Sequence, residues 1–466
     1  MTAVEQATAI RRGDLSPVEL VDHYLARIEA YDGLAAFHTV TADVARVQAK
    51  EAEAAVSAGR RLPALHGLPT AIKDLTPTAG VRTTYGSAAY AEHVPDTDAD
   101  VVRLLRAAGT ISLGKTATSE FGTTLYTETL AFPATRNPWR DGLSPGGSSG
   151  GAAAAVAAGL VPAAHGSDGG GSLRVPAALC GLVGYKPSRG LVPGSSGFGL
   201  ASHGPIARTV ADAAALLDAM AVALPGEPFA PPAHAGSFLA ATRRTPGRLR
   251  VARHLTPPLY DTAIDAECVA AYERAGARLA ELGHEVVDVP SPWEIDLADF
   301  TVLQCGLGRD VPEPRTKMTR WLAEQGQRYT AAELMAAHGR LLAAVRRAGR
   351  ALAGYDLVLT PTLARPSVPI GYFADLSPED DFDAQTELSP YCSVYNLSGQ
   401  PAVSVPAGLT ADGLPVGVML AAPLGADATL LSAAAMICES SAHPAIWGGT
   451  RSATVKPWLS RDARGV

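Results

Sequence analysis

Two serines and one lysine of this sequence combine side chains and local surroundings suited to acyl transfer. Ser148 lies in the glycine-rich turn Gly146–Gly151, and Ser172 lies in a second such turn, Asp168–Arg174. Glycine at this density lets the backbone approach a ligand closely and direct successive N–H groups at one place. A serine beside such donors has what acyl transfer needs for its oxyanion. With Lys73 ending a strand-like run upstream, the pattern predicts a hydrolase.

The elements that must position these residues alternate between helices and strands. Capping boxes beginning at Ser16 and Thr330 predict helices that run to about Ala30 and Leu352. Apolar periodicity predicts further helices over about 42–58, 101–108, 149–158 and 261–282 and from about 427. Strands are expected over about 68–72, 110–113, 248–252, 285–289, 356–360, 402–406 and 416–420. This interleaving predicts the α/β class.

The composition narrows the functional classes. The 466 residues are 47% hydrophobic and 18% charged, which supports a large core and does not indicate disorder. The net charge of −7, without a long basic run, argues against nucleic acid or an anionic membrane as a partner. We find no membrane-spanning run and no signal peptide. Five scattered cysteines without a C-x-x-C pair argue against a disulfide framework or a zinc site. We expect a cytoplasmic protein without a metal or cofactor.

Segment Gly109–Thr116 matches the P-loop pattern G-x-x-x-x-G-K-[ST]. Phosphate binding there requires a strand before Gly109 and a helix starting near Lys115. The sequence predicts the reverse order, with a helix first and a strand between the glycines. We therefore interpret the match as coincidental.

Segment Gly147–Gly151 also fits the nucleophile elbow G-x-S-x-G, with Ser149 as the nucleophile. That motif needs a strand running straight into the turn, whereas 137–145 reads as a loop. It would also need a late histidine, and the available His443 has no obvious partner. A flexible Gly/Ser linker is a further alternative, but such linkers rarely lead into an alanine-rich helix. Both alternatives are less favoured.

Several motifs, in order along nearly the whole chain, resemble the amidase signature family, serine amidohydrolases with a Ser–Ser–Lys triad. The matching segments are His66–Asp74, Leu113–Thr116, Glu120–Gly122, Thr135–Trp139, Ser144–Gly151, Asp168–Arg174, Gly184–Ser188, Leu359–Thr362, Asn396–Ala402 and Gly413–Gly417. The resemblance implies one large α/β domain with a mixed, mostly central β-sheet and helices on both faces.

The same resemblance divides this domain, residues 1–466, into regions. We expect a signature core over about 60–210 and a linker over about 222–247, where proline and glycine are dense. A variable, substrate-side subdomain of helices and strands is expected over about 248–355. The chain is then expected to return to the core over about 356–445.

The resemblance also implies roles for the three residues. Ser172 would be the nucleophile that forms an acyl-enzyme, and Ser148, held after a cis peptide bond in the family, would connect it to Lys73. Lys73 must be neutral to accept a proton, so burial must lower its pKa from the ordinary value near 10.4. The proton would return through Ser148 to the departing amine.

Other residues are expected to assist by the same resemblance. Substrate or oxyanion contacts are expected from Gly169, Gly170, Gly171, Gly122 and Ser149, and support of the loops from Asp168, Arg174 and Asn137. Ser149 is also expected to tie loops together with Asn137. Leu125 and Tyr126 are expected near the nucleophile, and Cys305 and Cys392 are interpreted as buried structural cysteines. The chain departs from the family at Gly169, where threonine or isoleucine is frequent.

The expected function is hydrolysis of a linear or cyclic, non-peptide carboxylic amide to a carboxylate and ammonia or an amine, with esterase side activity. The partner would be a small-molecule amide, and a homodimer is compatible with the family. An alternative within the family is the amidase subunit of a tRNA-dependent amidotransferase complex. A binding protein with a dead site is disfavoured because all three triad residues are present.

Overall fold

The strands of the protein form two sheets, which meet at the residues of interest. In this computed structural model, residues 1–466 are described except 197, 230–233, 235 and 441–466. The smaller sheet has the order β1-β3-β2, with β1 at Phe37–Val40, β3 at Ile111–Thr116 and β2 at Pro69–Lys73. Strand β1 runs antiparallel to β3, and β2 runs parallel to it.

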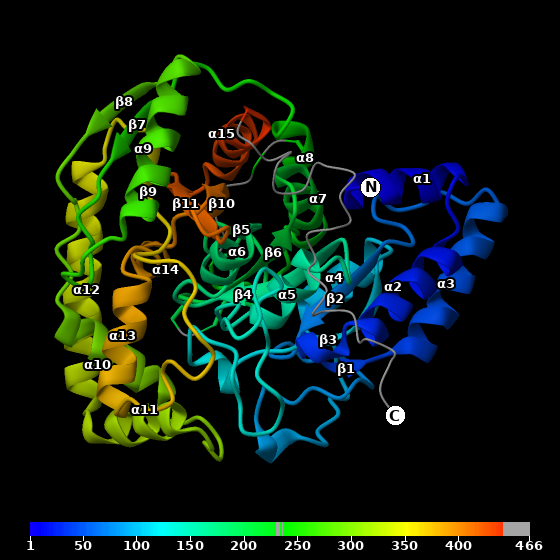
Figure 1. Ribbon diagram of the computed structural model, residues 1–466, viewed down its shortest axis with the longest axis horizontal. Helices are drawn as coiled ribbons and strands as arrows, with labels where there is room; N and C mark the ends of the chain where they lie inside the picture. The colour runs from blue at the N-terminus through cyan, green and yellow to red at the C-terminus, as the bar shows by residue number, and fades with distance from the viewer. Residues whose placement is uncertain (197, 230–233, 235, 441–466) are drawn as a thin grey trace.

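The larger sheet has the order β4-β6-β5-β10-β11-β9-β7-β8 (Figure 1). It is mixed, since pairing is antiparallel from β4 to β9 and parallel across β9, β7 and β8. The strands are β4 (Ala163–Asp168), β6 (Ser202–Ala207), β5 (Val183–Lys186), β10 (Ala402–Leu409), β11 (Pro415–Ala421), β9 (Leu357–Pro361), β7 (Arg250–Arg253) and β8 (Glu285–Asp288).

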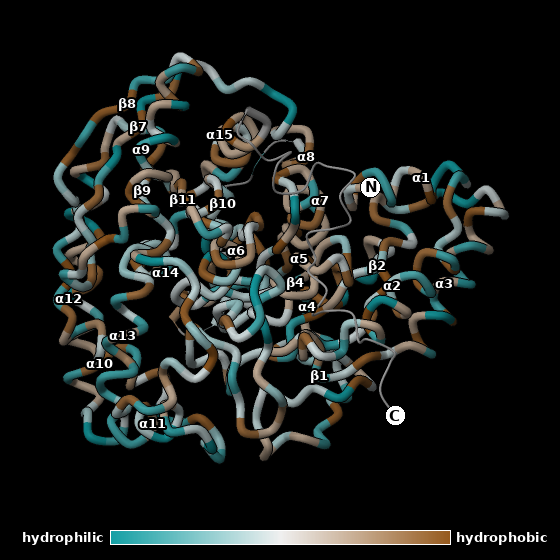
Figure 2. Tube along the Cα trace, viewed as in Figure 1, coloured by the Kyte–Doolittle hydropathy of each residue, from teal (hydrophilic) through white to brown (hydrophobic). Residues whose placement is uncertain are grey.

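Helices cover both faces of this sheet because alternate strand residues point to opposite sides. In β11, Val418 and Leu420 join the core under α7 (Val210–Met220), α9 (Ala266–Glu281) and α15 (Asp427–Ser440). Met419 faces the opposite side, where α5 (Gly150–Ala157) and α6 (Arg174–Cys180) pack. Helix α5 is buried on all sides and consists of small apolar residues, seen as pale and brown segments in the middle of Figure 2.

The remaining helices flank the sheets on two sides. Helices α1 (Ala3–Arg12), α2 (Pro17–Ala30) and α3 (Ala42–Ser57) lie beside the small sheet, and α10 (Leu297–Gly308), α11 (Lys317–Arg328), α12 (Ala331–Ala351) and α13 (Pro378–Leu388) lie on the opposite side of the molecule (Figure 1). Shorter elements are η1 (Asp32–Leu34), η2 (Ala88–Tyr90), α4 (Asp100–Ala107), η3 (Glu120–Gly122), α8 (Phe238–Ala241) and α14 (Ser393–Ser398).

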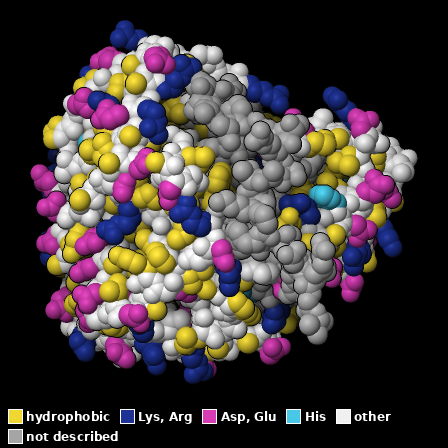
Figure 3. Space-filling view, in the orientation of Figure 1, with side chains coloured by type: hydrophobic (Ala, Val, Ile, Leu, Met, Phe, Trp, Pro, Cys, Tyr) yellow, Lys and Arg dark blue, Asp and Glu magenta, His cyan; other side chains and the backbone are white. Residues whose placement is uncertain are grey.

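The surface carries charges of both signs. On the face seen in Figure 3, lysine and arginine side chains are interspersed with aspartate and glutamate rather than gathered into one patch. Within the described part of the chain, no helix combines the length and the apolar composition that crossing a bilayer requires.

The predicted elements are present with small shifts at their ends. Thr330 forms a complete capping box, whereas the side chain of Ser16 only accepts from the N–H groups of Val18 and Glu19. The predicted order of the P-loop-like segment is confirmed, because Gly109 follows α4 and Lys115 lies within β3. Strand β3 is longer than predicted because Lys115 and Thr116 pair with β2.

Two features of the topology were not predicted. The small sheet as a unit and strands β4 and β6 of the large one have no clear sequence pattern, since β4 reads Ala-Ala-His-Gly-Ser-Asp and contains no β-branched residue. The region over about 248–355 also contributes β7 and β8 to the same large sheet. Its strands therefore extend the core, and its helices α10, α11 and α12 pack beside it.

Candidate active site

Lys73 lies at the end of β2, where the small sheet meets strand β4 of the large sheet. Its side chain is fully buried, at 0% exposure. The Nζ atom lies 2.7 Å from Ser148 Oγ, 3.1 Å from Ser167 Oγ and 3.3 Å from the Ser167 carbonyl oxygen. The amine is therefore surrounded by neutral oxygens that can accept or share a proton.

The electrostatics of this position favour a neutral amine. Burial lowers the pKa of Lys73 to about 7, and the opposing influence of the Asp168 carboxylate is smaller. No carboxylate lies within salt-bridge distance of Lys73 among the described residues. A large fraction of Lys73 is thus unprotonated at neutral pH, as a general base requires.

Ser148 lies in the loop that leads into α5, and the peptide bond between Gly147 and Ser148 is cis. A side chain at Gly147 would place its Cβ 2.7 Å from the backbone nitrogen of Tyr126, so only glycine fits there. Gly122 covers Ser148 from the other side, with a φ of 74° and a virtual Cβ 3.4 Å from Ser148 Oγ. The absence of side chains at Gly147 and Gly122 thus lets the backbone pack closely around Ser148.

Ser172 follows β4, and its side chain faces the same cavity as that of Ser148. This cavity has a volume of about 300 Å³. Its wall carries many polar side chains beside the apolar Leu75, Phe121 and Ala201; the polar ones are Thr76, Tyr85, Ser148, Ser167, Ser172, Ser196, Ser202 and His203. The structure therefore brings Lys73, Ser148 and Ser172 to one place, with the two serines open to a ligand.

The glycine turn before Ser172 has both free and engaged N–H groups. The N–H groups of Gly169, Gly170 and Ser172 have no hydrogen-bond partner among the described residues. The N–H of Gly171 instead donates to Asp168 Oδ1 at 2.7 Å. The expectation that Gly171 contributes a donor to the oxyanion site is therefore wrong, because Asp168 already occupies that donor.

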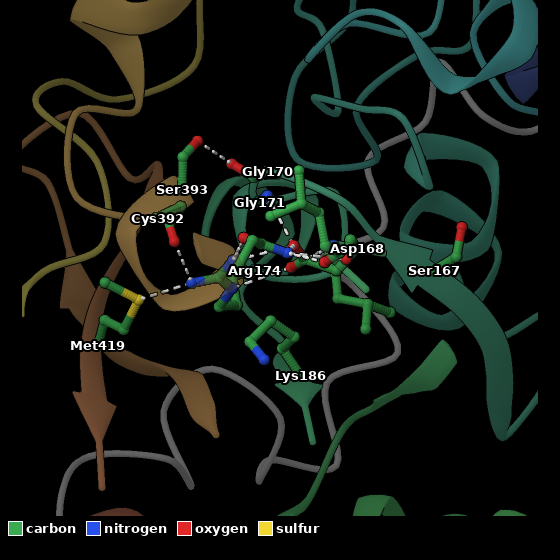
Figure 4. Close-up of polar contacts among 12 residues, drawn as sticks. Ser167, Asp168, Gly170, Gly171, Arg174, Lys186, Cys392, Ser393 and Met419 are labelled. Atoms are coloured by element: carbon green, nitrogen blue, oxygen red, sulfur yellow. Dashed lines mark hydrogen bonds and ion pairs between the residues drawn. The ribbon is translucent and has the colours of Figure 1, made fainter. Parts of the chain in front are cut away.

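A buried ion pair fixes this turn (Figure 4). The Arg174 guanidinium donates twice to Asp168, from Nε to Oδ2 and from Nη2 to Oδ1, both at 2.9 Å. Asp168 Oδ2 also accepts from the N–H of Leu173 at 3.1 Å. Burial alone would raise the pKa of Asp168, but the charge and hydrogen bonds of Arg174 hold it well below its usual range. The carboxylate thus stays ionised and ties both ends of the turn together.

Helix α14, far along the chain, completes the support. Asn396 Oδ1 accepts from Arg174 Nη2 at 2.7 Å, and the Cys392 carbonyl accepts from Arg174 Nη1 at 2.8 Å. Ser393 Oγ donates to the Gly170 carbonyl at 3.0 Å. Sequence reasoning did not assign these roles, nor that of Ser167 beside Lys73. The one sequence signal for them was that Asn396 begins the segment Asn396–Ala402, which matches the family pattern.

Ser149 does not contact the substrate space. It is fully buried, its hydroxyl donates to the Ser167 carbonyl at 3.1 Å, and it lines neither cavity at the site among the described residues. The expected substrate contact of Ser149 is therefore wrong, whereas its expected role of tying loops together is confirmed, since its hydroxyl joins the α5 loop to β4. His443, the histidine of the nucleophile-elbow alternative, lies outside the described residues.

The other predicted residues lie as follows. Asn137 Nδ2 donates to the carbonyls of Leu179 at 3.0 Å and Ser144 at 3.3 Å, which joins the loop before Ser148 to α6. Leu125 lines the second cavity described below, whereas Tyr126 packs on Phe373 and lines neither cavity among the described residues. Cys305 and Cys392 are both fully buried.

A second cavity, of about 250 Å³, opens on the other side of Ser172. The two cavities share Phe121, Gly122, Gly169, Ser172 and Ala201. The described residues lining the second one carry no charge, and apolar side chains form most of its wall, with Gln304 and Gln385 as its large polar side chains; the apolar ones include Leu125, Leu200, Leu259, Phe300, Leu307, Leu322 and Phe382. Ser172 thus lies where a polar and an apolar cavity meet.

Gly169 lies at this junction. A side chain there would meet only the Ala201 Cβ, at 3.8 Å, so the space beside Gly169 is open because no side chain fills it. The absence of a side chain at Gly169 therefore leaves room where the two cavities meet.

A family model described as Amidase matches residues 19–307 and 297–431. The chain is 41% identical over 458 residues to the amidase-family protein AmiB2 of Mycobacterium tuberculosis, covering 95% of this chain and 96% of that protein. It is 35% identical over 468 residues to an acylamidase of Rhodococcus erythropolis, covering 93% and 94%. The structure of a 6-aminohexanoate cyclic dimer hydrolase superposes with a TM-score of 0.87 at 33% identity, covering 94% of this chain and 96% of that one.

The chain belongs to the amidase family, and its mixed sheet with helices on both faces is the fold of the amidase signature enzymes. The named relatives are amide hydrolases, which supports the same class of reaction for this chain and does not favour the amidotransferase-subunit alternative.

Proposed function

We propose that this amidase cleaves the C–N bond of a small-molecule amide through an acyl-enzyme on Ser172, with Ser148 and Lys73 moving the proton. One observation carries the proposal: the desolvated Lys73 amine lies 2.7 Å from Ser148 Oγ, and Ser148 and Ser172 face one cavity. The matched family and the names of the relatives support it.

The reaction follows from these positions. As Ser172 Oγ bonds to the amide carbon, its proton passes to Ser148, whose own proton passes to Lys73. The negative oxygen is stabilised by the free N–H groups of the glycine turn, those of Gly169, Gly170 and Ser172. When the C–N bond breaks, Ser148 gives a proton to the amine and regains one from Lys73. Water then cleaves the ester by the same path, releasing the carboxylate.

The two cavities divide the substrate between them. Ser148 lines the polar cavity but not the apolar one among the described residues. Because the departing nitrogen takes its proton from Ser148, the amine half belongs in the polar cavity. The acyl half then belongs in the apolar cavity, where an uncharged hydrocarbon chain or ring is favoured since charge without a partner is costly to bury.

Replacing Ser172 with alanine tests the nucleophile. We expect Ser172→Ala to lower amide hydrolysis by on the order of 10³-fold or more while the unfolding midpoint stays within a degree or two, as for other nucleophile deletions. The measurement is kcat/KM with hexanamide, together with mass spectrometry of the intact protein after a fluorophosphonate probe.

The matched control is Ser149→Ala, at the neighbouring serine of the glycine-rich turns. The probe should label wild type and Ser149→Ala on Ser172 and leave Ser172→Ala unlabelled. Labelling of Ser149, or full activity of Ser172→Ala, would refute the assignment and restore the nucleophile-elbow alternative.

A further inference from the structure

A pair of histidines runs from Lys73 to the wall of the polar cavity. His165, on β4, lies directly behind the lysine, and its Nδ1 accepts from the Lys73 backbone N–H at 3.4 Å. Its other nitrogen, Nε2, lies 3.0 Å from Nδ1 of His203 on β6. Both rings are neutral at neutral pH, because burial and the neighbouring Lys73 lower the pKa of each, that of His203 to about 4.

These contacts determine where the protons sit on the two rings. A backbone N–H can only donate, so His165 Nδ1 is an acceptor, and a neutral ring then carries its proton on Nε2. That proton points to His203 Nδ1, which must accept it. The single ring proton of His203 is therefore on Nε2. The backbone of β2 thus determines, through His165, which nitrogen of His203 is a donor.

The donor nitrogen of His203 lies at the wall of the polar cavity. A Cβ added at Gly194, which lines this cavity, would lie 3.4 Å from His203 Nε2, and His203 lines the cavity as well. His203 Nε2 has no hydrogen-bond partner among the described residues. Thr76 Oγ1, in the wall of the same cavity, is likewise buried without a partner in the described part of the chain. Two polar groups there lack protein partners.

A group that can only donate a hydrogen bond distinguishes between ligands with and without an acceptor, whereas a hydroxyl, which can donate or accept, does so less. The hydroxyls of Tyr85 and Ser202 in the same wall can rotate and act as donors or acceptors. The Nε2–H of His203 can only donate. A ligand that places an oxygen acceptor opposite it gains a hydrogen bond, and a ligand that places a methyl group there leaves the donor unpaired.

We propose that His203 Nε2–H is the specificity-determining donor of the amine-half cavity, and that the natural substrates are amides whose amine half carries a carbonyl oxygen close to the scissile nitrogen. The proposal rests on the proposed function, because the amine half is placed by proton return through Ser148. A second amide group in the amine half has the required chemistry.

The test compares two substrates that share one acyl group. N-hexanoylglycinamide carries a carbonyl in its amine half, and N-isobutylhexanamide has methyl groups in place of the oxygen and nitrogen of that terminal amide. We expect wild type to favour the former in kcat/KM by about five- to tenfold, the value of one neutral hydrogen bond. His203→Phe should bring this ratio close to one, and His203→Gln, which keeps an N–H near the same position, should restore most of it.

Each outcome bears on the proposal. A wild-type ratio near one overturns it without recourse to any variant, so the test does not depend on folding of His203→Phe. The proposal would also be overturned if His203→Phe kept the wild-type ratio of kcat/KM for the two substrates. The same holds if this variant lost activity equally on both substrates, and in either case His203 would have a structural role. Detection of hexanoyl-Ser172 by mass spectrometry with either substrate tests the proposed function separately, so the two failures are distinguishable.

Discussion

At the scale of the residue, the position of Lys73 in the structure is what suits it to the proposed role of a base. The same side chain on the surface would be protonated at neutral pH, whereas at the junction of two sheets burial brings its pKa to about 7. Lys115 and Lys186 are equally buried, with pKa values lowered to about 8 and about 7. Lys115 Nζ donates to threonine oxygens and Lys186 Nζ to the Pro187 carbonyl, whereas Lys73 Nζ lies beside Ser148, which lines a cavity. A lysine with a lowered pKa is therefore placed to act as a base only where a serine hydroxyl lies beside it and an open cavity lies beside that serine.

This pKa predicts the pH dependence of activity. Below about pH 7 Lys73 is protonated in the free enzyme, so kcat/KM for an uncharged amide should fall about tenfold per pH unit and level off above pH 8. The measurement is a kcat/KM profile from pH 5 to 9. Lys186→Met, which removes an equally buried lysine, should keep the inflection near pH 7. An inflection near pH 4, or none, would contradict the assignment of Lys73 as the base.

At the scale of the element, the glycine turn before Ser172 is held by contacts from a distant helix. Arg174 links Asp168, at the end of β4, to Cys392 and Asn396 in and beside α14. The guanidinium and the carboxylate are both fully buried. Removing one partner of such a pair leaves an uncompensated buried charge, which costs more than the pair contributes.

Arg174→Met should therefore destabilise the protein by about 3–5 kcal/mol and lower activity as the turn loses its anchor. Urea unfolding followed by circular dichroism measures the first effect. The matched control is Arg250→Met, at a surface pair with Glu285 in which both side chains are 40% exposed or more. That variant should leave the unfolding midpoint unchanged. Equal midpoints for the two variants would contradict the anchoring role.

The elements also show what could be predicted from the sequence. Strand β2 and the helices with capping residues were predictable because their apolar spacing and capping residues are local. Strand β4 was not, because small residues buried on both faces have no alternation, and its pairing with β6 is a tertiary effect. The engagement of Gly171 by Asp168 and the pairing of His165 with His203 likewise depend on three-dimensional contacts that spacing does not encode.

At the scale of the whole molecule, the buried lysines couple stability to pH. Their folded pKa values of about 7, 8 and 7 lie below the unfolded value near 10.5. Between these limits the unfolded chain binds more protons than the folded protein, so stability rises with pH. The cost of burying these amines is fully present below about pH 7 and is relieved as the pH approaches 10.

Lys73→Met should remove one such contribution. Between pH 7.5 and 9.5 we expect the slope of the free energy of unfolding against pH to be lower for Lys73→Met than for wild type by about 1.4 kcal/mol per pH unit. Urea titrations at several pH values compare the two slopes. Parallel curves would show that Lys73 titrates alike in the folded and unfolded chains.

The chain order of the ion-pair network has a consequence for biosynthesis. Lys73, Ser148 and Ser172 all lie in the first half of the chain, but Arg174 finds its outer acceptors at Cys392 and Asn396. A nascent polypeptide therefore carries all three residues long before the outer acceptors of Arg174 exist. We expect the turn before Ser172 to become rigid only after α14 has been translated and has docked.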